Sequence, residues 1–106
     1  MKYAALIRLA KHSQHHQFKH VSILIKGHVI LNWGVNNSNR HSEIAAIKGY
    51  EPEQLRNSML VNFRMTKTGK LANSKPCDDC MEVLLDSGVR VVWYSTPEGF
   101  EKLRIY

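Results

Sequence analysis

The stretch that decides the fold is residues 76–106, PCDDCMEVLLDSGVRVVWYSTPEGFEKLRIY. Pro76 is typical of a helix start, and the pattern predicts a helix over Cys77 to Asp86 that Gly88 ends. Val89 to Ser95 follows as a short apolar run rich in β-branched and aromatic residues, which indicates a buried strand. A helix that leads into a buried strand is the pattern of an α/β fold.

The end of the chain limits how the last strand can pair. Thr96 to Gly99 is typical of a turn, and Phe100 to Tyr106 can form one more strand. A parallel partner would require a crossover of about a dozen residues or more, usually containing a helix. Only residues 96–106 follow the buried run, and they must include the strand itself. We therefore expect a hairpin in which the last two strands are antiparallel.

Upstream of this stretch, short helical and β-rich segments alternate. Apolar residues at helical spacing from Tyr3 to Ala10 predict an amphipathic helix over Lys2 to His15. The other expected elements are strands over His20 to Lys26 and His28 to Trp33 around Gly27, a loop over Gly34 to Arg40, a helix over His41 to Lys48 ended by Gly49, a short helix or turn from Pro52, a strand over Met59 to Met65 and a turn over Thr66 to Lys70. This order predicts an α/β (α-β-α) fold: one domain over residues 1–106, with a single mixed sheet of four to five strands covered by helices.

Composition places the chain among ordinary globular domains. Its 106 residues are 43% hydrophobic and 23% charged, which excludes a disordered tail, a coiled coil and a collagen-like repeat. The longest apolar run, residues 21–25, is too short to span a bilayer, and the N-terminus has no secretion-signal pattern. We expect a cytoplasmic protein with no membrane partner, and the small size and helix-covered sheet favour a homo-oligomer.

The excess positive charge lies in the first part of the chain. Lys and Arg total 15 against 9 Asp and Glu, which gives a net charge of +6 at pH 7. No acidic residue precedes Glu43, and all six histidines fall within residues 1–42. A basic surface favours an anionic partner, either a nucleotide phosphate or a nucleic-acid backbone. A solvated basic face without a partner is the alternative.

Two short motifs carry candidate chemistry, and each begins an expected helix. The first is His-Ser-Glu at residues 41–43, and the second is Pro-Cys-Asp-Asp-Cys at residues 76–80. His41, Cys77 and Cys80 offer one imidazole and two thiolates, a ligand set that suits zinc. Three protein ligands leave the fourth tetrahedral position for water, which is typical of a catalytic zinc. The glutamate of the first motif could approach that water without ligating the metal.

Together the motifs, His-x-Glu and Pro-Cys-x-x-Cys, match the signature of zinc deaminases. The sequence resembles the cytidine deaminase superfamily over most of the chain, including the order of helices and strands. The resemblance implies a sheet with Zn²⁺ held between two helices by His41, Cys77 and Cys80. It also implies that Glu43 moves protons from water to the base and to the departing ammonia, and that Asn36 lies against the sugar.

The resemblance also bears on the substrate, and its signals conflict. Antiparallel final strands are similar to those of superfamily members that act on free nucleosides, whereas the histidine ligand and the basic N-terminal part favour nucleotides or nucleic acid. The expected reaction is hydrolytic deamination of cytosine to uracil in a free (deoxy)cytidine-type nucleoside or nucleotide, with zinc activating water for attack at C4. The alternatives are a cytosine deaminase acting on single-stranded nucleic acid and a zinc-stabilised nucleic-acid-binding module.

Several residues near the motifs are candidate substrate contacts. Arg40, beside the first motif, could meet a phosphate, and Tyr94 and Phe100 could touch the base. Weaker phosphate candidates are Lys19 and Lys26, and the aromatic residues expected in the core are Trp33 and Trp93. The candidate substrate contacts therefore come both before His41 and after Cys80 in the sequence.

Other interpretations of the motifs stay open. A thioredoxin-like redox pair would explain the two cysteines but not the His-x-Glu motif. A structural zinc site would need a fourth ligand, from His12, His15, His16, His20 or His28. A catalytically inactive relative would carry the same residues. Ser42 departs from the commoner alanine of the family and is expected to be tolerated, whereas residues 73–75 depart from the pattern of tRNA adenosine deaminases.

Overall fold

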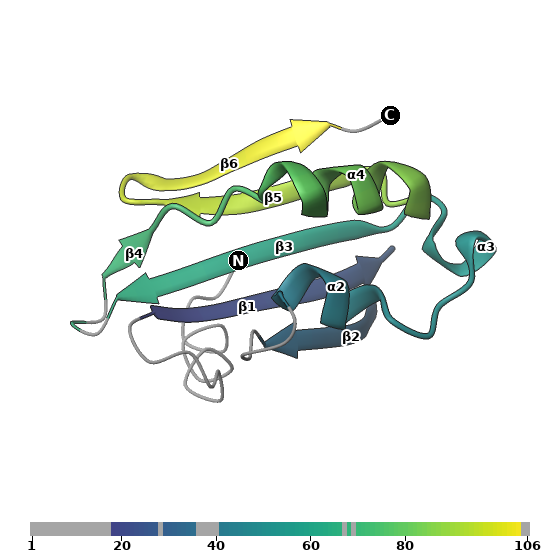
Figure 1. Cartoon of the computed structure of the whole chain (residues 1–106), viewed down its shortest axis with the longest axis horizontal. Helices are drawn as coiled ribbons and strands as arrows, with labels where there is room; N and C mark the ends of the chain where they lie inside the picture. The colour runs from purple at the N-terminus through teal and green to yellow at the C-terminus, as the bar shows by residue number, and fades with distance from the viewer. Residues whose placement is uncertain (1–17, 28, 36–40, 67, 69, 105–106) are drawn as a thin grey trace.

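The computed structural model describes residues 18–27, 29–35, 41–66, 68 and 70–104, which form one six-stranded sheet and three helices (Figure 1). In chain order, the elements are β1 (Phe18–Lys26), β2 (Val29–Val35), α2 (Ser42–Ile47), α3 (Pro52–Leu55), β3 (Met59–Thr66), β4 (Leu71–Ala72), α4 (Asp78–Ser87), β5 (Val91–Thr96) and β6 (Gly99–Arg104). The helix expected over Lys2 to His15 lies outside the described residues.

The sheet is mixed, as predicted. Its strands run in the order β2-β1-β3-β5-β6, and β4 pairs with β3. β3 is antiparallel to β1 and parallel to β5, with α4 in the connection between β3 and β5. β5 and β6 are antiparallel, which confirms the hairpin expected at the end of the chain. The expected count of four to five strands was too low, because the two residues of β4 are too few to show an alternating pattern.

Helix α4 begins and ends where the local sequence favours it. Cys77 is its N-cap residue, one position after Pro76, and Asp78 and Asp79 occupy the first turn, where the helix dipole favours negative charge. Gly88 closes the helix at φ 102°, a left-handed conformation that glycine adopts readily. The predicted end at Gly88 is confirmed. Within the described ranges, no helix combines the length and apolar character that a membrane crossing requires.

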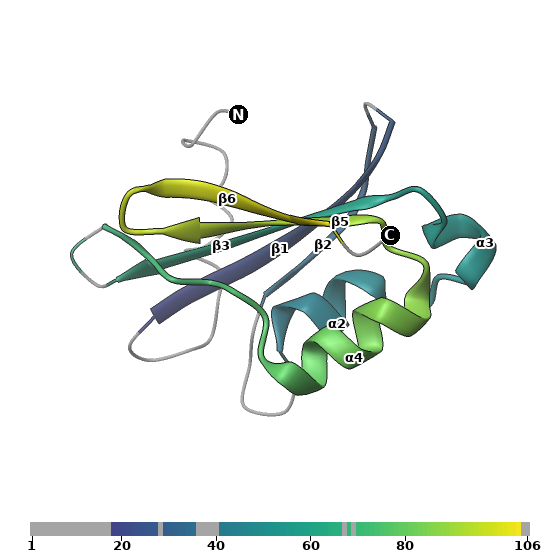
Figure 2. The same ribbon diagram turned by 90° about the horizontal axis from the view of Figure 1, so that it is seen from above.

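Helices α2 and α4 lie side by side on one face of the sheet (Figure 2). Buried apolar side chains fill the space between the helices and this face: Leu24, Ala46, Ile47, Leu55, Leu60, Leu84, Val89 and Val92. The opposite face carries a second buried cluster: Val21, Ile23, Val61, Phe63 and Met65. Successive strand residues point to opposite faces, so β1 and β3 contribute to both clusters.

The close seating of α2 on β2 depends on one glycine. A Cβ added at Gly34 would lie 2.7 Å from atoms of Ser42, Ala45 and Ala46. Any side chain larger than hydrogen would therefore push the helix away from the strand. Gly34 lets the first turn of α2, which carries the His-Ser-Glu motif, lie directly over the sheet.

Candidate metal centre

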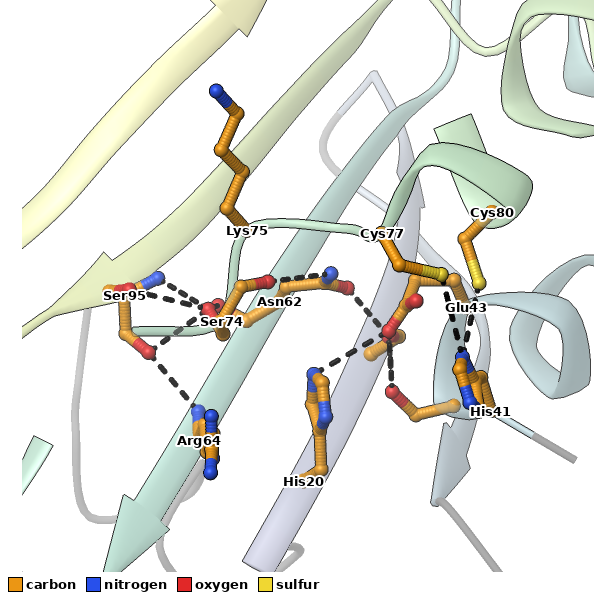
Figure 3. Close-up of polar contacts among 12 residues, drawn as sticks. His20, His41, Glu43, Asn62, Arg64, Ser74, Lys75, Cys77, Cys80 and Ser95 are labelled. Carbon is orange, nitrogen blue, oxygen red and sulfur yellow. Dashed lines mark hydrogen bonds and ion pairs between the residues drawn. The ribbon is translucent and has the colours of Figure 1, made fainter. Parts of the chain in front are cut away.

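The two motifs come together where α2 and α4 begin (Figure 3). His41 is the N-cap residue of α2 and Cys77 is the N-cap residue of α4, each with an extended backbone. Cys80 lies about one turn further along α4, and residues three apart share one side of a helix. Because the helices are neighbours, the imidazole of His41 faces both thiols. We call these three residues the metal-ligand group.

Distances within the metal-ligand group fit a tetrahedral ion. His41 Nδ1 lies 3.2 Å from Cys80 Sγ and 3.8 Å from Cys77 Sγ, and the three ligand atoms lie within 4.8 Å of one another. Metal bonds of about 2.0–2.3 Å at tetrahedral angles place neighbouring ligand atoms roughly 3.6 Å apart. Cys80 is buried, whereas His41 and Cys77 are exposed. The group can therefore hold a metal ion that is reached from one open side.

The group contains three metal-binding side chains within the described part of the chain. Of the histidines considered as a fourth ligand, His20 is described, and its Nε2 lies 3.3 Å from Glu43 Oε1. His12, His15, His16 and His28 lie outside the described residues. The two cysteines are free thiols. In this structure, His20 thus belongs to the surroundings of the glutamate.

In the absence of a bound cation, the surroundings of Cys80 disfavour the thiolate form of its side chain. Burial first, and then the negative charge of Glu43, raise the pKa of the Cys80 thiol well above its usual range. Metals bind the thiolate form, and a bound cation reverses the local preference by stabilising that form. Cys80 is therefore a thiol that could serve as a ligand only if a metal ion displaced its proton.

Glu43 lies beside the metal-ligand group and is only 2% exposed. A hydrogen bond between its carboxylate and Cys80 is one cause of the raised thiol pKa. The Glu43 Oε1 atom also accepts a hydrogen bond from Ser42 Oγ at 2.9 Å and lies 3.3 Å from His20 Nε2. Carboxylates are rarely this buried unless they are paired, so these polar neighbours account for the position of Glu43.

A network of buried hydrogen bonds continues from Ser42 into the sheet, and Figure 3 shows its part from Asn62 to Ser74 and Ser95. Ser42 Oγ lies 2.8 Å from Ser22 Oγ, and Ser22 Oγ donates to Asn62 Oδ1. Asn62 Nδ2 donates to Ser74 O, and Ser95 Oγ donates to Ser74 Oγ. All five residues are buried. We call them the buried polar network. The sequence did not predict it, although Ser22 and Asn62 interrupt the apolar runs at residues 21–25 and 59–63.

The two aromatic residues predicted to touch a base have other partners. Phe100 stacks on Phe63, with ring centroids 6.2 Å apart, in the cluster on the face opposite the helices. The structure therefore does not bring Phe100 to the metal-ligand group. Tyr94 lies on β5, where its hydroxyl donates to Glu101 Oε2 at 2.8 Å. This hydrogen bond is the main cause that raises the pKa of Tyr94 above its ordinary value.

Asn36 and Arg40, predicted to contact the sugar and a phosphate, lie outside the described residues. Lys26, one of the weaker phosphate candidates, donates from Nζ to two backbone carbonyls of α3. Its ammonium group therefore lies at α3, whereas the metal-ligand group belongs to α2 and α4. Trp93 packs against the second cluster, as expected, but Trp33 is 44% exposed. The core prediction was wrong for Trp33 because, among the described strands, β2 lies at the edge of the sheet.

The geometry establishes a mixed sheet and a group of one histidine and two cysteines that could bind a metal ion. Both features are compatible with the resemblance noted in the motifs, and neither is specific to one family. No family model, curated protein or solved structure matches the chain.

Proposed function

We propose that this protein is a zinc-dependent hydrolytic deaminase of the cytidine deaminase type, which converts cytosine to uracil in a free (deoxy)cytidine-type nucleoside or nucleotide. The observation that carries the proposal is a buried carboxylate, Glu43, beside three side chains able to hold a metal ion. A purely structural metal site has no use for this carboxylate. A hydrolytic site needs one, because protons must move at each step.

In the proposed reaction, His41, Cys77 and Cys80 hold the ion, and the exposed side of the group admits the base. When bound, zinc supplies Lewis-acid activation of water near neutral pH. Glu43 takes a proton from the attacking water and returns protons to the ring nitrogen and to the amine at C4. Water is consumed, ammonia leaves, and the cytosine ring becomes uracil. The burial of Glu43 shields these proton transfers from bulk solvent.

The choice of a free nucleoside or nucleotide is supported by the end of the chain. β5 and β6 pair as an antiparallel hairpin, an arrangement similar to that of superfamily members acting on free nucleosides. The net charge of +6 supports a second candidate, deamination of cytosine within single-stranded nucleic acid. It equally supports a zinc-stabilised module that binds nucleic acid without chemistry.

The test is a substrate panel with the purified full chain and measured zinc content. Cytidine, deoxycytidine, their mono- and triphosphates and a cytosine-containing oligonucleotide are scored for ammonia release and for the uracil product. Conversion of a free member supports the proposal, with Glu43→Gln as the inactive control. Conversion of the oligonucleotide alone assigns the second candidate. If the protein binds the oligonucleotide in a salt-dependent way but converts no member of the panel, it is a nucleic-acid-binding module and not a deaminase.

Arg40→Ala separates nucleotide from nucleoside substrates. If Arg40 meets a phosphate, the variant should raise KM for the phosphorylated substrate by roughly 10- to 150-fold, the range for one hydrogen bond to a charged group. KM for the free nucleoside should stay within about twofold, since no phosphate contact is lost. Equal effects on cytidine and on its monophosphate would show that Arg40 does not contact the phosphate.

A further inference from the structure

Two polar contacts of the Glu43 carboxylate are made to the same oxygen. Ser42 Oγ donates to Oε1 at 2.9 Å, and His20 Nε2 lies 3.3 Å from Oε1. Ser42 belongs to the first turn of α2, whereas His20 belongs to β1, so the two side chains reach Oε1 from different elements. The terminal torsion of a glutamate is otherwise loosely defined. Contacts from two elements to Oε1 restrict this torsion and thereby set the direction of Oε2.

Ser42 is itself held by the buried polar network. Its hydroxyl lies 2.8 Å from that of Ser22, which donates to Asn62 Oδ1. Ser22 and Asn62 are directly opposite each other in the β1–β3 register, so the sheet places them without a flexible connection. Buried polar groups are costly unless paired. Because Ser22 gives its one hydroxyl hydrogen to Asn62, its oxygen packs against that of Ser42 without donating to it. This contact restricts the position of the Ser42 oxygen and leaves the Ser42 hydrogen for Glu43.

His20 has the more exposed side chain of the two, at 22%. Its Nε2 atom is buried and approaches Oε1 at ion-pair distance, without the geometry of a hydrogen bond. It faces the helices from β1 together with Ser22, because residues two apart on a strand share a face. The sheet thus supports both contacts to Glu43: directly through His20, and indirectly through Ser22 and Ser42.

We propose that Ser42 and His20 are positioning residues, which hold Oε1 of Glu43 so that Oε2 is the oxygen that exchanges protons during the reaction. The inference rests on the proposed deaminase function. Ser42 is fully buried and adjoins the proton-transferring residue without being one of the metal ligands. Its contribution should therefore affect the rate of the chemical step and leave substrate binding unchanged.

The first test is Ser42→Ala, with Ser22→Ala as the matched control. Both variants remove one buried hydroxyl, but only Ser42 contacts Glu43. Ser42→Ala should lower kcat on the order of 10-fold, the scale of a small misplacement of a reacting group. KM and zinc content should stay unchanged. Ser22→Ala should lower kcat less. Equal losses of kcat in both variants, with equal falls in Tm, would assign the hydroxyls a structural role only.

The second test compares His20→Leu with His20→Gln. Leucine removes the polar contact to Oε1, whereas glutamine keeps a polar nitrogen that can approach Oε1 as a donor. We expect His20→Leu to lower kcat on the order of 10-fold, and His20→Gln to recover most of that loss. A raised KM with unchanged kcat in His20→Leu would show that His20 touches substrate, which would overturn its positioning role.

Crystal structures of the wild type and of Ser42→Ala provide a readout that does not depend on activity. The wild type should keep both contacts to Oε1, and the variant should show a rotated or doubly placed carboxylate. A wild type without these contacts overturns the inference, whatever its activity. Contacts kept in a protein that converts no panel member would contradict the proposed function. If the wild type is active and the variants are equally active, the proposed deaminase function stands, but Ser42 and His20 are not positioning residues.

Discussion

On the sheet face that meets the helices, two neighbouring cross-strand pairs are equally buried but differ in chemistry. The cross-strand pairs of β1 and β3 on this face are, in order, Leu24 with Leu60, Ser22 with Asn62 and His20 with Arg64. The first two pairs are all fully buried. We call the leucine pair the apolar end and the serine–asparagine pair, with His20, the polar end. Depth in the fold therefore does not explain why one end is polar.

The opposite face of the same strands shows that the backbone does not require polar residues. There, Val21 faces Phe63 and Ile23 faces Val61, and all four are buried and apolar. Polar residues occur on the helix face, next to the place where α2 and α4 begin. Because buried polar groups are costly unless paired, the difference points to a requirement of the site above the polar end.

Loss of a metal ligand, next to the polar end, should have the largest effect. Cys80→Ala is expected to lose stoichiometric zinc, because folding and binding share the free energy of metal coordination. Metal analysis of the purified protein measures this. Leu60→Ala, at the apolar end, is the control and should keep its zinc. Full zinc occupancy in Cys80→Ala would show that the metal-ligand group has been misassigned.

Replacing Glu43 should separate chemistry from metal binding at the polar end. Glu43→Gln keeps the side-chain shape and is expected to retain zinc, while kcat falls by about 10²- to 10⁴-fold. In the metal-free protein, the pKa of the Cys80 thiol should move down, because the charge of Glu43 is among the causes that raise it. Activity assays and a thiol titration monitor the two effects. Near wild-type activity would exclude Glu43 as the proton-transferring group.

Substitutions at the two ends should also lower the free energy of unfolding by different amounts, a smaller effect than the loss of zinc or of activity. Leu60→Ala leaves a cavity in the apolar core and should lower the free energy of unfolding by about 2–5 kcal/mol. Asn62→Ala removes partners of Ser22 and Ser74 and should cost about 1–3 kcal/mol, the penalty for buried groups left unpaired. Urea unfolding at one fixed zinc concentration compares them. An unchanged stability in Asn62→Ala would mean that the network is not needed for folding.

The smallest effect is expected at the exposed contact between Tyr94 of β5 and Glu101 of β6. Glu101→Ala should lower the pKa of Tyr94 toward its ordinary value, because it removes the hydrogen bond to Glu101, which is the main cause of the upward shift. The stabilisation from this bond is present while the hydroxyl is protonated and is lost as the pH rises through the raised pKa. Ultraviolet absorbance follows the titration, with Tyr50→Phe as a control for the other described tyrosine signal. An unchanged Tyr94 titration would contradict the assignment.

Much of the architecture could be predicted because its signals are local. The helix ending at Gly88, the buried strand after it and the final hairpin each follow from a few neighbouring residues. β4 could not be predicted, since two residues form a strand there only because β3 lies beside them. The exposure of Trp33 likewise depends on β2 having the edge position, which its own sequence does not encode.

The sequence by itself determined the spacing of the ligands: Cys77 and Cys80 share a side of one helix because they are three residues apart. Only the tertiary structure decided that His41 would face them, and that His20 and Ser42 would meet one oxygen of Glu43. These contacts join residues from different elements, and their geometry depends on strand register and on how closely α2 lies over the sheet. Local patterns define elements, whereas the packing of elements against one another defines the site.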